Sequence, residues 1–118
     1  NMLTAVLKCI PDKSVAVHFH NTYGGALANI LRSLQMGISA VDSSVAGIGG
    51  CPFAKKATGN VPTEDVVYML QGMDIDTGIN LEELIAVGEW ICGVIDKGNN
   101  SNVARAYLSQ NPAKGVVS

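Results

Sequence analysis

The sequence predicts an α/β fold with a parallel sheet. Helix-like and strand-like segments alternate from residue 2 to residue 72, and this alternation is typical of βα units. Polar residues and glycines follow each predicted strand, where the active sites of such sheets lie. A complete (β/α)8 barrel needs about 250 residues, whereas this chain has 118. We therefore expect the C-terminal portion of a (β/α)8 TIM barrel, an incomplete barrel followed by C-terminal helices.

The first two predicted elements are a helix and a strand. Apolar residues at positions 3, 6, 7 and 10 form a helical stripe, and Pro11 ends it. Residues 14–20 are largely apolar, with Val15 and Val17 contributing β-branched side chains. This composition favours a strand buried in a parallel sheet, and we expect it to run to His20.

A second helix and a second strand follow. Apolar residues at positions 27, 30, 31 and 34 predict a helix that ends at Gly37. Residues 38–41 predict another buried strand, which ends at Asp42. Beyond it, a glycine-rich stretch over residues 47–50 leads to Cys51. Glycine gives this backbone access to positive φ, so we interpret the stretch as a catalytic lid.

Three helices are predicted in the second half of the chain, over residues 63–72, 81–97 and 102–108. Thr63 is the expected N-cap of the first of them. Asn80 and Glu83 stand in capping-box positions for the second, and Gly98 is its expected stop. Trp90, on the second helix, is most simply a core residue.

The composition indicates one globular unit and excludes several function classes. The chain is 47% hydrophobic, carries a net charge of −2 and has no block of Lys or Arg. We therefore expect neither nucleic acid nor a membrane surface as a partner. No apolar run approaches the roughly 18 residues that span a bilayer, and no targeting signal is visible. We assign residues 1–98 to the βα units and residues 99–118 to a terminal helix and a frayed tail.

The chain has three cysteines, Cys9, Cys51 and Cys92, without metal-finger spacing. An odd number without a disulfide pattern favours a reducing compartment. Cys9 and Cys92 lie on the apolar faces of predicted helices and have a structural interpretation. Cys51 has two: a small thiol that packs beneath the loop, or an accessible thiol, set between Gly50 and a proline, that takes part in proton transfer.

His18 and His20 stand two positions apart on the first predicted strand, so both imidazoles point to the same side. Such a pair is often structural, but it is also the arrangement that two ligands of one ion require. Asn60, which follows the glycine-rich stretch, offers an amide oxygen at the same edge of the sheet. Two nitrogens with oxygens and open positions suit Mg²⁺ or Mn²⁺ better than a zinc ion held by thiolates.

Three further polar residues have two interpretations each. Asp42 ends the second strand and either orients a metal-bound histidine or caps the following loop together with Ser43 and Ser44. Lys55 and Lys56 either solvate the loop or contact the phosphates of a large anionic substrate.

These residues resemble the 3-hydroxy-3-methylglutaryl-CoA lyase family, within the metal-dependent aldolase-type TIM barrels. The resemblance runs from Met2 to about Val94. It is carried by the stretches AVHFHNTYG (16–24), ALAN (26–29), LQMG (34–37), VDSSVAG (41–47) and GN (59–60). The sequence GGCPF at residues 49–53 is similar to the cysteine signature of the lyase and is more specific than the paired histidines, which the wider group shares.

The resemblance implies a function and a site. It implies divalent-metal-dependent retro-Claisen cleavage of 3-hydroxy-3-methylglutaryl-CoA to acetyl-CoA and acetoacetate, a step of leucine degradation and ketone-body formation. His18, His20 and Asn60 would bind the cation, Mg²⁺ or Mn²⁺, and Cys51 would be the catalytic cysteine of the lid. The implied partner is an acyl-CoA substrate, and the full-length enzyme is expected to be a homodimer. The implied location is the mitochondrial matrix in a eukaryote or the cytoplasm in a bacterium.

The chain departs from the pattern of this family in two respects. Asn21 stands where the family has an aspartate, so hydrogen bonding is kept and a charge is lost. The early strands of the barrel, with the aspartate ligand and the arginine of the family, are not in this sequence, so we expect the chain by itself to be inactive. Two alternatives remain: an enzyme of the isopropylmalate or homocitrate synthase type, which condenses acetyl-CoA with a 2-oxo acid, and a non-catalytic half-barrel.

Overall fold

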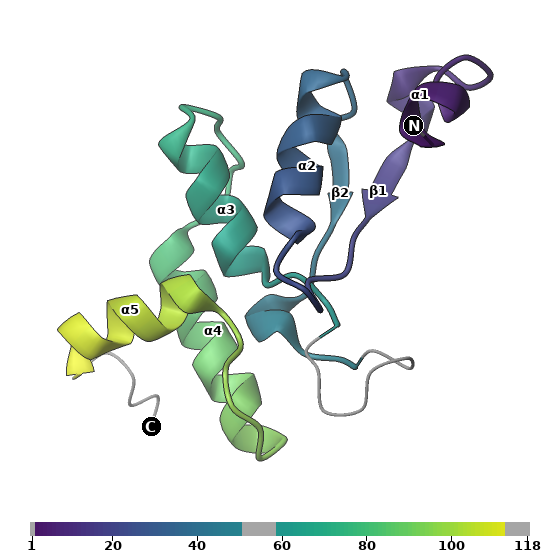
Figure 1. Cartoon of the computed structure of the whole chain (residues 1–118). Coiled ribbons are helices and arrows are strands. Elements are labelled where there is room, and N and C mark those ends of the chain that lie inside the picture. The colour runs from purple at the N-terminus through teal and green to yellow at the C-terminus, as the bar shows by residue number, and fades with distance from the viewer. Residues whose placement is uncertain (1, 51–58, 113–118) are drawn as a thin grey trace.

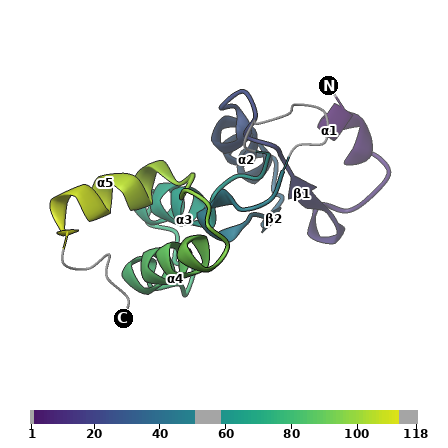
Figure 2. The ribbon, with the colours of Figure 1, turned by 90° about the horizontal axis from the view of Figure 1, so that it is seen from below.

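The computed structural model describes residues 2–50 and 59–112. Its elements in chain order are α1 (Met2–Val6), β1 (Ala16–His18), α2 (Ala26–Gln35), β2 (Ala40–Asp42), α3 (Thr63–Gly72), α4 (Leu81–Val94) and α5 (Asn102–Gln110), with short 3₁₀ turns at Asp12–Ser14 and Val45–Gly47. The two strands and α2 form one layered part, and α3 lies between this part and the helices α4 and α5 (Figures 1 and 2). The order of the first elements is the βα alternation that the sequence predicts.

The sheet of the described residues consists of β1 and β2, which pair in parallel as expected. The register sets Ala16 opposite Ala40, Val17 opposite Val41, and His18 opposite Asp42. Both strands are shorter than predicted. Beyond His18 the chain leaves β2, and His20 instead forms an isolated bridge with Asn60.

One face of this sheet is buried and the other is open, which corrects the prediction of strands buried on both faces. Val17 is 5% exposed, whereas its neighbours Ala16 and His18 are exposed. Ala40 and Asp42 are exposed on β2. The reason is the alternation of side chains along a strand: α2 packs over the face of Val17, and no described element covers the other face.

The core lies between α2, α3 and the strands. Its fully buried members include Ala26 and Ile30 of α2 and Val66 of α3. Partly buried side chains pack around them, namely Phe19, Leu27, Leu34, Val41, Met69 and Leu70. Burial of each large apolar side chain contributes about 1.5–3 kcal/mol. This contact holds α3, and with it the segment that carries Asn60, against the first βα unit.

The helix ends agree only partly with the predicted signals. Gly37 has φ +93° and follows α2, as predicted. Asn80 caps α4 by accepting hydrogen bonds from the backbone N–H of Glu82 and Glu83. Thr63 is not a cap, because Pro62 is the N-cap residue of α3 and makes no side-chain cap bond.

The C-terminal end of α4 also differs from the prediction. This helix ends at Val94 rather than at Lys97, because Asp96, and not Gly98, takes the left-handed conformation with φ +53°. The N–H of Lys97 then donates to the carbonyl of Cys92 at 3.0 Å, which is the closing bond of a Schellman motif. Helix α5 extends to Gln110, beyond the predicted end at residue 108.

Two packing predictions were wrong. Cys9 is exposed in the turns after α1, and Trp90 is 54% exposed. The buried side of α4 is formed by Ile85, Gly88 and Cys92. Trp90 lies two positions from Gly88 and from Cys92, which is about 200° around a helix, so it faces away from the core. Cys92 is buried, as predicted.

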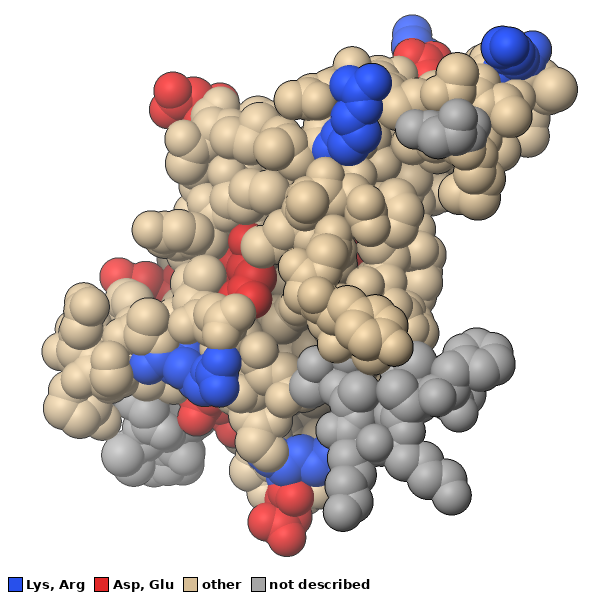
Figure 3. Space-filling view, viewed as in Figure 1, with Lys and Arg blue, Asp and Glu red and all other residues tan. Residues whose placement is uncertain are grey.

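The surface has no dominant charge on the side shown in Figure 3. Lys and Arg side chains lie apart from one another there and form no continuous patch. Among the described helices, none is long and apolar enough to cross a membrane.

Candidate functional site

The two histidines lie side by side where β1 ends. His18 is the last residue of the strand, and His20 follows in the bridge to Asn60. The centroids of the two imidazole rings are 5.3 Å apart, with the rings tilted by 54°. The structure therefore places three residues singled out in the sequence, His18, His20 and Asn60, at one edge of the sheet.

Asn60 is held with its amide nitrogen turned into the protein. Its Nδ2 donates to the carbonyl oxygen of Ile48 at 3.0 Å. Gly49 has φ +120°, and a Cβ at this position would collide with the Asn60 amide. A side chain at position 49 would therefore displace Asn60. Because the nitrogen is used inside the protein, Oδ1 is the Asn60 atom suited to a cation.

The loop after His20 is tied down by Asn21. Its backbone N–H donates to the carbonyl of Gly59 at 2.7 Å, which continues the bridge between the two segments. Its side-chain Oδ1 accepts from the N–H of Ala26 at 3.2 Å, at the first residue of α2. The amide at this position therefore serves the start of α2, a role that needs an acceptor oxygen but no charge.

Asp42 contacts His18 across the sheet. The parallel register sets the two residues opposite each other, and Asp42 Oδ2 lies 3.4 Å from His18 Nδ1. The alternative role, capping of the following loop, is filled by its neighbours. The Ser44 hydroxyl donates to the carbonyl of Ile48 at 2.8 Å, and Ser43 shares a hydrogen bond of 2.8 Å with Thr63.

The turn before the glycine-rich stretch is held by a buried carboxylate that sequence reasoning missed. Ala46 has φ +53°, and its N–H donates to both oxygens of Glu64 at 2.9 Å. Glu64 is 0% exposed, and burial raises its pKa above the ordinary value of 4.5, while hydrogen bonds from the backbone of Glu64 and Ala46 oppose the shift. In the sequence, Glu64 is one of two acidic residues in the first turn of a helix, and nothing distinguishes it from an exposed one.

Asp65, the next residue, ties α5 to α3. The hydroxyl of Ser101 donates to Asp65 Oδ1 at 2.6 Å, and the N–H of Val103 donates to the same oxygen at 3.0 Å. Ser101 in turn accepts from the N–H of Ala104 as the N-cap of α5. The adjacent Asn100 donates its N–H to the carbonyl of Ala46 at 3.0 Å. Residues 100 and 101 therefore link α5 to the same turn that Glu64 holds.

Three residues of the predicted site, Cys51, Lys55 and Lys56, lie outside the described residues. Their roles stay predictions. Within residues 2–50 and 59–112, no group of three His, Cys, Asp or Glu side chains could hold an ion. The donors that the described part brings together are two imidazoles and one amide oxygen. They fit part of the coordination shell of Mg²⁺ or Mn²⁺, and a complete shell needs further oxygen ligands.

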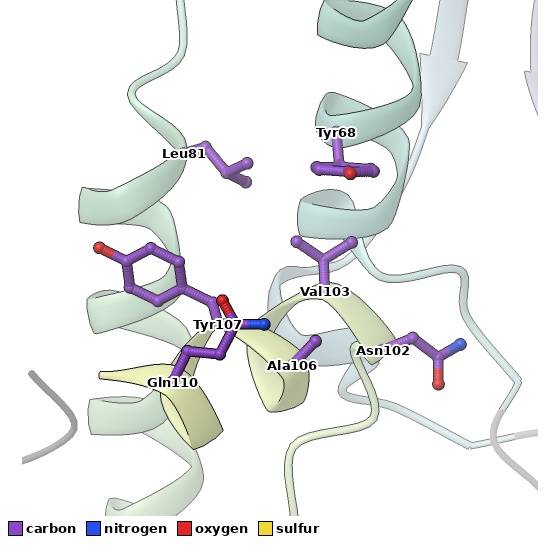
Figure 4. Close-up of a pocket in the computed structure, with 7 residues that line it drawn as sticks. All are labelled: Tyr68, Leu81, Asn102, Val103, Ala106, Tyr107 and Gln110. Carbon is purple, nitrogen blue, oxygen red and sulfur yellow. The ribbon is translucent and has the colours of Figure 1, made fainter. Parts of the chain in front are cut away.

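A groove of about 370 Å³ lies away from these residues, between α3, the start of α4 and α5. Figure 4 shows Tyr68 and Tyr107 on different helices of this groove, with Val103 next to Tyr68 in this view. The other lining residues are Leu81, Asn102, Ala106 and Gln110. The described lining of this groove contains no Asp, Glu, His, Cys, Lys or Arg. The candidate site residues named above lie instead at the ends of the strands.

Comparisons with known proteins find a matching family model and several similar proteins. The model of the HMGL-like family matches residues 1–91. The mitochondrial hydroxymethylglutaryl-CoA lyase of Rattus norvegicus is 58% identical over 90% of this chain and 33% of its own length. The cytoplasmic 3-hydroxy-3-methylglutaryl-CoA lyase of Mus musculus is 57% identical over 92% of this chain and 32% of its own length. The chain thus spans about a third of the curated relatives it matches.

Solved structures of lyases are similar to this chain in fold as well as in sequence. The hydroxymethylglutaryl-CoA lyase of Pseudomonas aeruginosa is 51% identical, with a TM-score of 0.89 over 92% of this chain and 36% of that one. An HMG-CoA lyase of Acinetobacter baumannii, solved with coenzyme A and 3-methylmalate, is 36% identical, with a TM-score of 0.80 over 89% of this chain and 34% of that one. These neighbours are TIM barrels, so the predicted fold class is confirmed as part of such a barrel. The chain belongs to the HMGL-like family.

Proposed function

We propose that this chain supplies the metal-binding strand ends of a hydroxymethylglutaryl-CoA lyase. The observation that carries the proposal is the meeting of His18, His20 and Asn60 at one edge of the sheet, in a chain 57–58% identical to curated lyases. The reaction is the cleavage of 3-hydroxy-3-methylglutaryl-CoA to acetyl-CoA and acetoacetate. Because the chain spans about a third of those lyases, the activity belongs to the whole barrel, and we expect the chain by itself to be inactive.

His18, His20 and Asn60 are the residues of this chain that would hold the cation. When bound, a divalent cation polarises the hydroxyl and carboxylate oxygens of the substrate, which makes the hydroxyl proton easier to remove. The contribution of the chain is to fix these donors. The bridge between His20 and Asn60 holds the two segments together, and the hydrogen bond to Ile48 fixes the Asn60 amide.

The proposed reaction breaks the bond between C2 and C3 of the acyl group. A base removes the proton of the 3-hydroxyl, and the electrons of that O–H bond form the ketone of acetoacetate. The electron pair of the broken carbon–carbon bond stays on C2 of the departing acetyl-CoA. Cys51 then delivers a proton to C2. Its place in the sequence, between Gly50 and Pro52 in the GGCPF stretch, supports this role.

The partner and the location follow from the same proposal. A related lyase was solved with coenzyme A, which supports an acyl-CoA substrate. The homodimer expected of the complete enzyme stays a prediction. The relatives include both mitochondrial and cytoplasmic enzymes, even within one organism, and we propose the mitochondrial matrix or the cytoplasm as the location.

The proposal is tested in a hybrid barrel, in which this chain is joined to the part of the Pseudomonas aeruginosa lyase that it does not cover. We expect this hybrid barrel to cleave the substrate with Mn²⁺. His20→Ala should lower cleavage at limiting Mn²⁺ at least tenfold, because one ligand is lost. The matched control is Tyr23→Ala, which removes a ring that is 98% exposed in the same loop and should leave cleavage unchanged.

Three results would contradict the proposal in different ways. Condensation of acetyl-CoA with a 2-oxo acid, without cleavage, would assign the barrel to the synthase type. A folded hybrid barrel that is inactive in both reactions would support the non-catalytic half-barrel. Full activity of His20→Ala at limiting Mn²⁺ would remove His20 from the ligands.

A further inference from the structure

Asp42 stands at the position of the sheet from which His18 can be oriented. In the register of β1 and β2, the two residues are direct partners. The backbone pairing therefore fixes their proximity, and it does not depend on a long flexible side chain. Both side chains are on the open face, with 56% of His18 and 63% of Asp42 exposed.

The contact selects one nitrogen of the imidazole. Asp42 Oδ2 lies 3.4 Å from His18 Nδ1. A carboxylate accepts hydrogen bonds, so the proton of the neutral ring is favoured on Nδ1. Nε2 then keeps its lone pair, which is the requirement for a ligand of a cation. Carboxylates that accept from the second nitrogen of a metal-binding histidine have this effect in many metalloproteins.

Two other roles for Asp42 are disfavoured by the described residues. The loop that follows it is capped by Ser44 through the carbonyl of Ile48. Direct ligation would require Asp42 to join His18 and His20 as a third donor, and the described residues contain no such group of three. The side chain of Asp42 therefore acts on the His18 ring.

We propose that Asp42 is a positioning residue that holds the Nδ1–H tautomer of His18 and so prepares Nε2 to bind the divalent cation. This inference rests on the proposed function, because it concerns the same metal site. It also has a part that is independent of metal and of activity, namely the tautomer itself.

The tautomer is measured in the hybrid barrel by ¹⁵N NMR of the histidine rings at pH 8, without metal. This chain contains two histidines, so labelling of this segment alone, by ligation to an unlabelled remainder, gives the signals of His18 and His20. We expect His18 to carry its proton on Nδ1. In Asp42→Ala, we expect His18 to shift toward the Nε2–H form, while His20 stays unchanged as an internal control. In Asp42→Asn, the amide oxygen still accepts, so the Nδ1–H form should remain.

The second measurement is the affinity for Mn²⁺ alone, from electron paramagnetic resonance of the free ion. Asp42→Ala should weaken binding about 10–100-fold, and Asp42→Asn should recover most of the loss. The matched control is Asp74→Asn, which removes the same charge in a turn with φ +58°, a conformation that Asn tolerates. It should leave the affinity unchanged.

The outcomes separate this inference from the proposed function. A His18 tautomer that does not change in Asp42→Ala overturns the inference, whatever metal binding shows. Retention of the tautomer in Asp42→Asn together with the full loss of Mn²⁺ affinity also overturns it, because Asp42 would then act as a ligand. A tautomer that responds as expected in a protein that binds no Mn²⁺ supports the orienting role and refutes the proposed metal site.

Discussion

Replacement of Glu64 by alanine should destabilise the fold strongly, because one carboxylate holds the turn at Ala46. The Glu64 side chain is 0% exposed, and both of its oxygens accept from the N–H of Ala46 at 2.9 Å. Its loss leaves a buried donor unsatisfied, which costs about 1–3 kcal/mol. One buried methylene group is also lost, at about 0.8 kcal/mol. The free energy of unfolding should therefore fall by about 2–4 kcal/mol.

The assay is thermal unfolding of the hybrid barrel, followed by circular dichroism. At about 2–4 °C for each kcal/mol, the expected decrease in Tm is roughly 4–16 °C. Glu83→Ala is the matched control, because Glu83 is also in the first turn of a helix but is exposed. It should cost less than about 1 kcal/mol. A decrease in Tm for Glu64→Ala no larger than that for Glu83→Ala would refute the role of the buried contact.

Three further predictions concern pH, the Asn60 amide and the thiol. The pKa of Glu64 is raised by burial, so the folded state holds its proton more tightly than the unfolded state. The free energy of unfolding of the wild type, relative to that of Glu64→Gln, should therefore decrease as the pH rises above about 4.5. Urea unfolding of both proteins at several pH values measures this difference, and a difference that stays constant or increases with pH would contradict the prediction. Gly49→Ala should weaken Mn²⁺ binding at least tenfold, because a Cβ would displace Asn60, and unchanged affinity would show that the Asn60 amide is not a ligand. Cys51→Ala should lower turnover by orders of magnitude with Mn²⁺ affinity kept, and Cys9→Ala, at an exposed thiol, should keep turnover; near-normal turnover of Cys51→Ala would return that residue to a packing role.

Local sequence patterns predicted the elements well, because periodicity and caps act over a few residues. The apolar stripe at residues 27–34 correctly predicted α2, and Asn80 correctly predicted the start of α4. The prediction of Thr63 as an N-cap was wrong because α3 already begins at Thr63, and the Thr63 hydroxyl shares a hydrogen bond of 2.8 Å with Ser43. The local sequence does not reveal that a residue of another segment binds this hydroxyl.

The parts that the sequence did not predict depend on contacts between distant segments. Glu64 binds Ala46, 18 positions away, and Asp65 binds Ser101, 36 positions away. Neither partner is marked by a local pattern. The exposure of Trp90 has a similar cause, because α4 uses the side with Gly88, where the absence of a side chain leaves room for Glu64. The grouping of His18, His20 and Asn60 was predictable because parallel strands end at a common edge.

The hydrogen bonds of Asn100 and Ser101 make the turn at Ala46 and the Asp65 carboxylate sensitive to truncation of the C-terminal part of the chain. The match to the family model ends at residue 91, so these two residues lie beyond the matched region. A chain shortened to residue 98 would keep every proposed ligand and the cysteine. It would nevertheless lose the donor to the Ala46 carbonyl and leave the Asp65 carboxylate, 4% exposed, without its hydroxyl partner. Substitutions at residues 100 and 101 would therefore affect the site by loosening the turn at Ala46 and the packing of α5, without changing any proposed ligand.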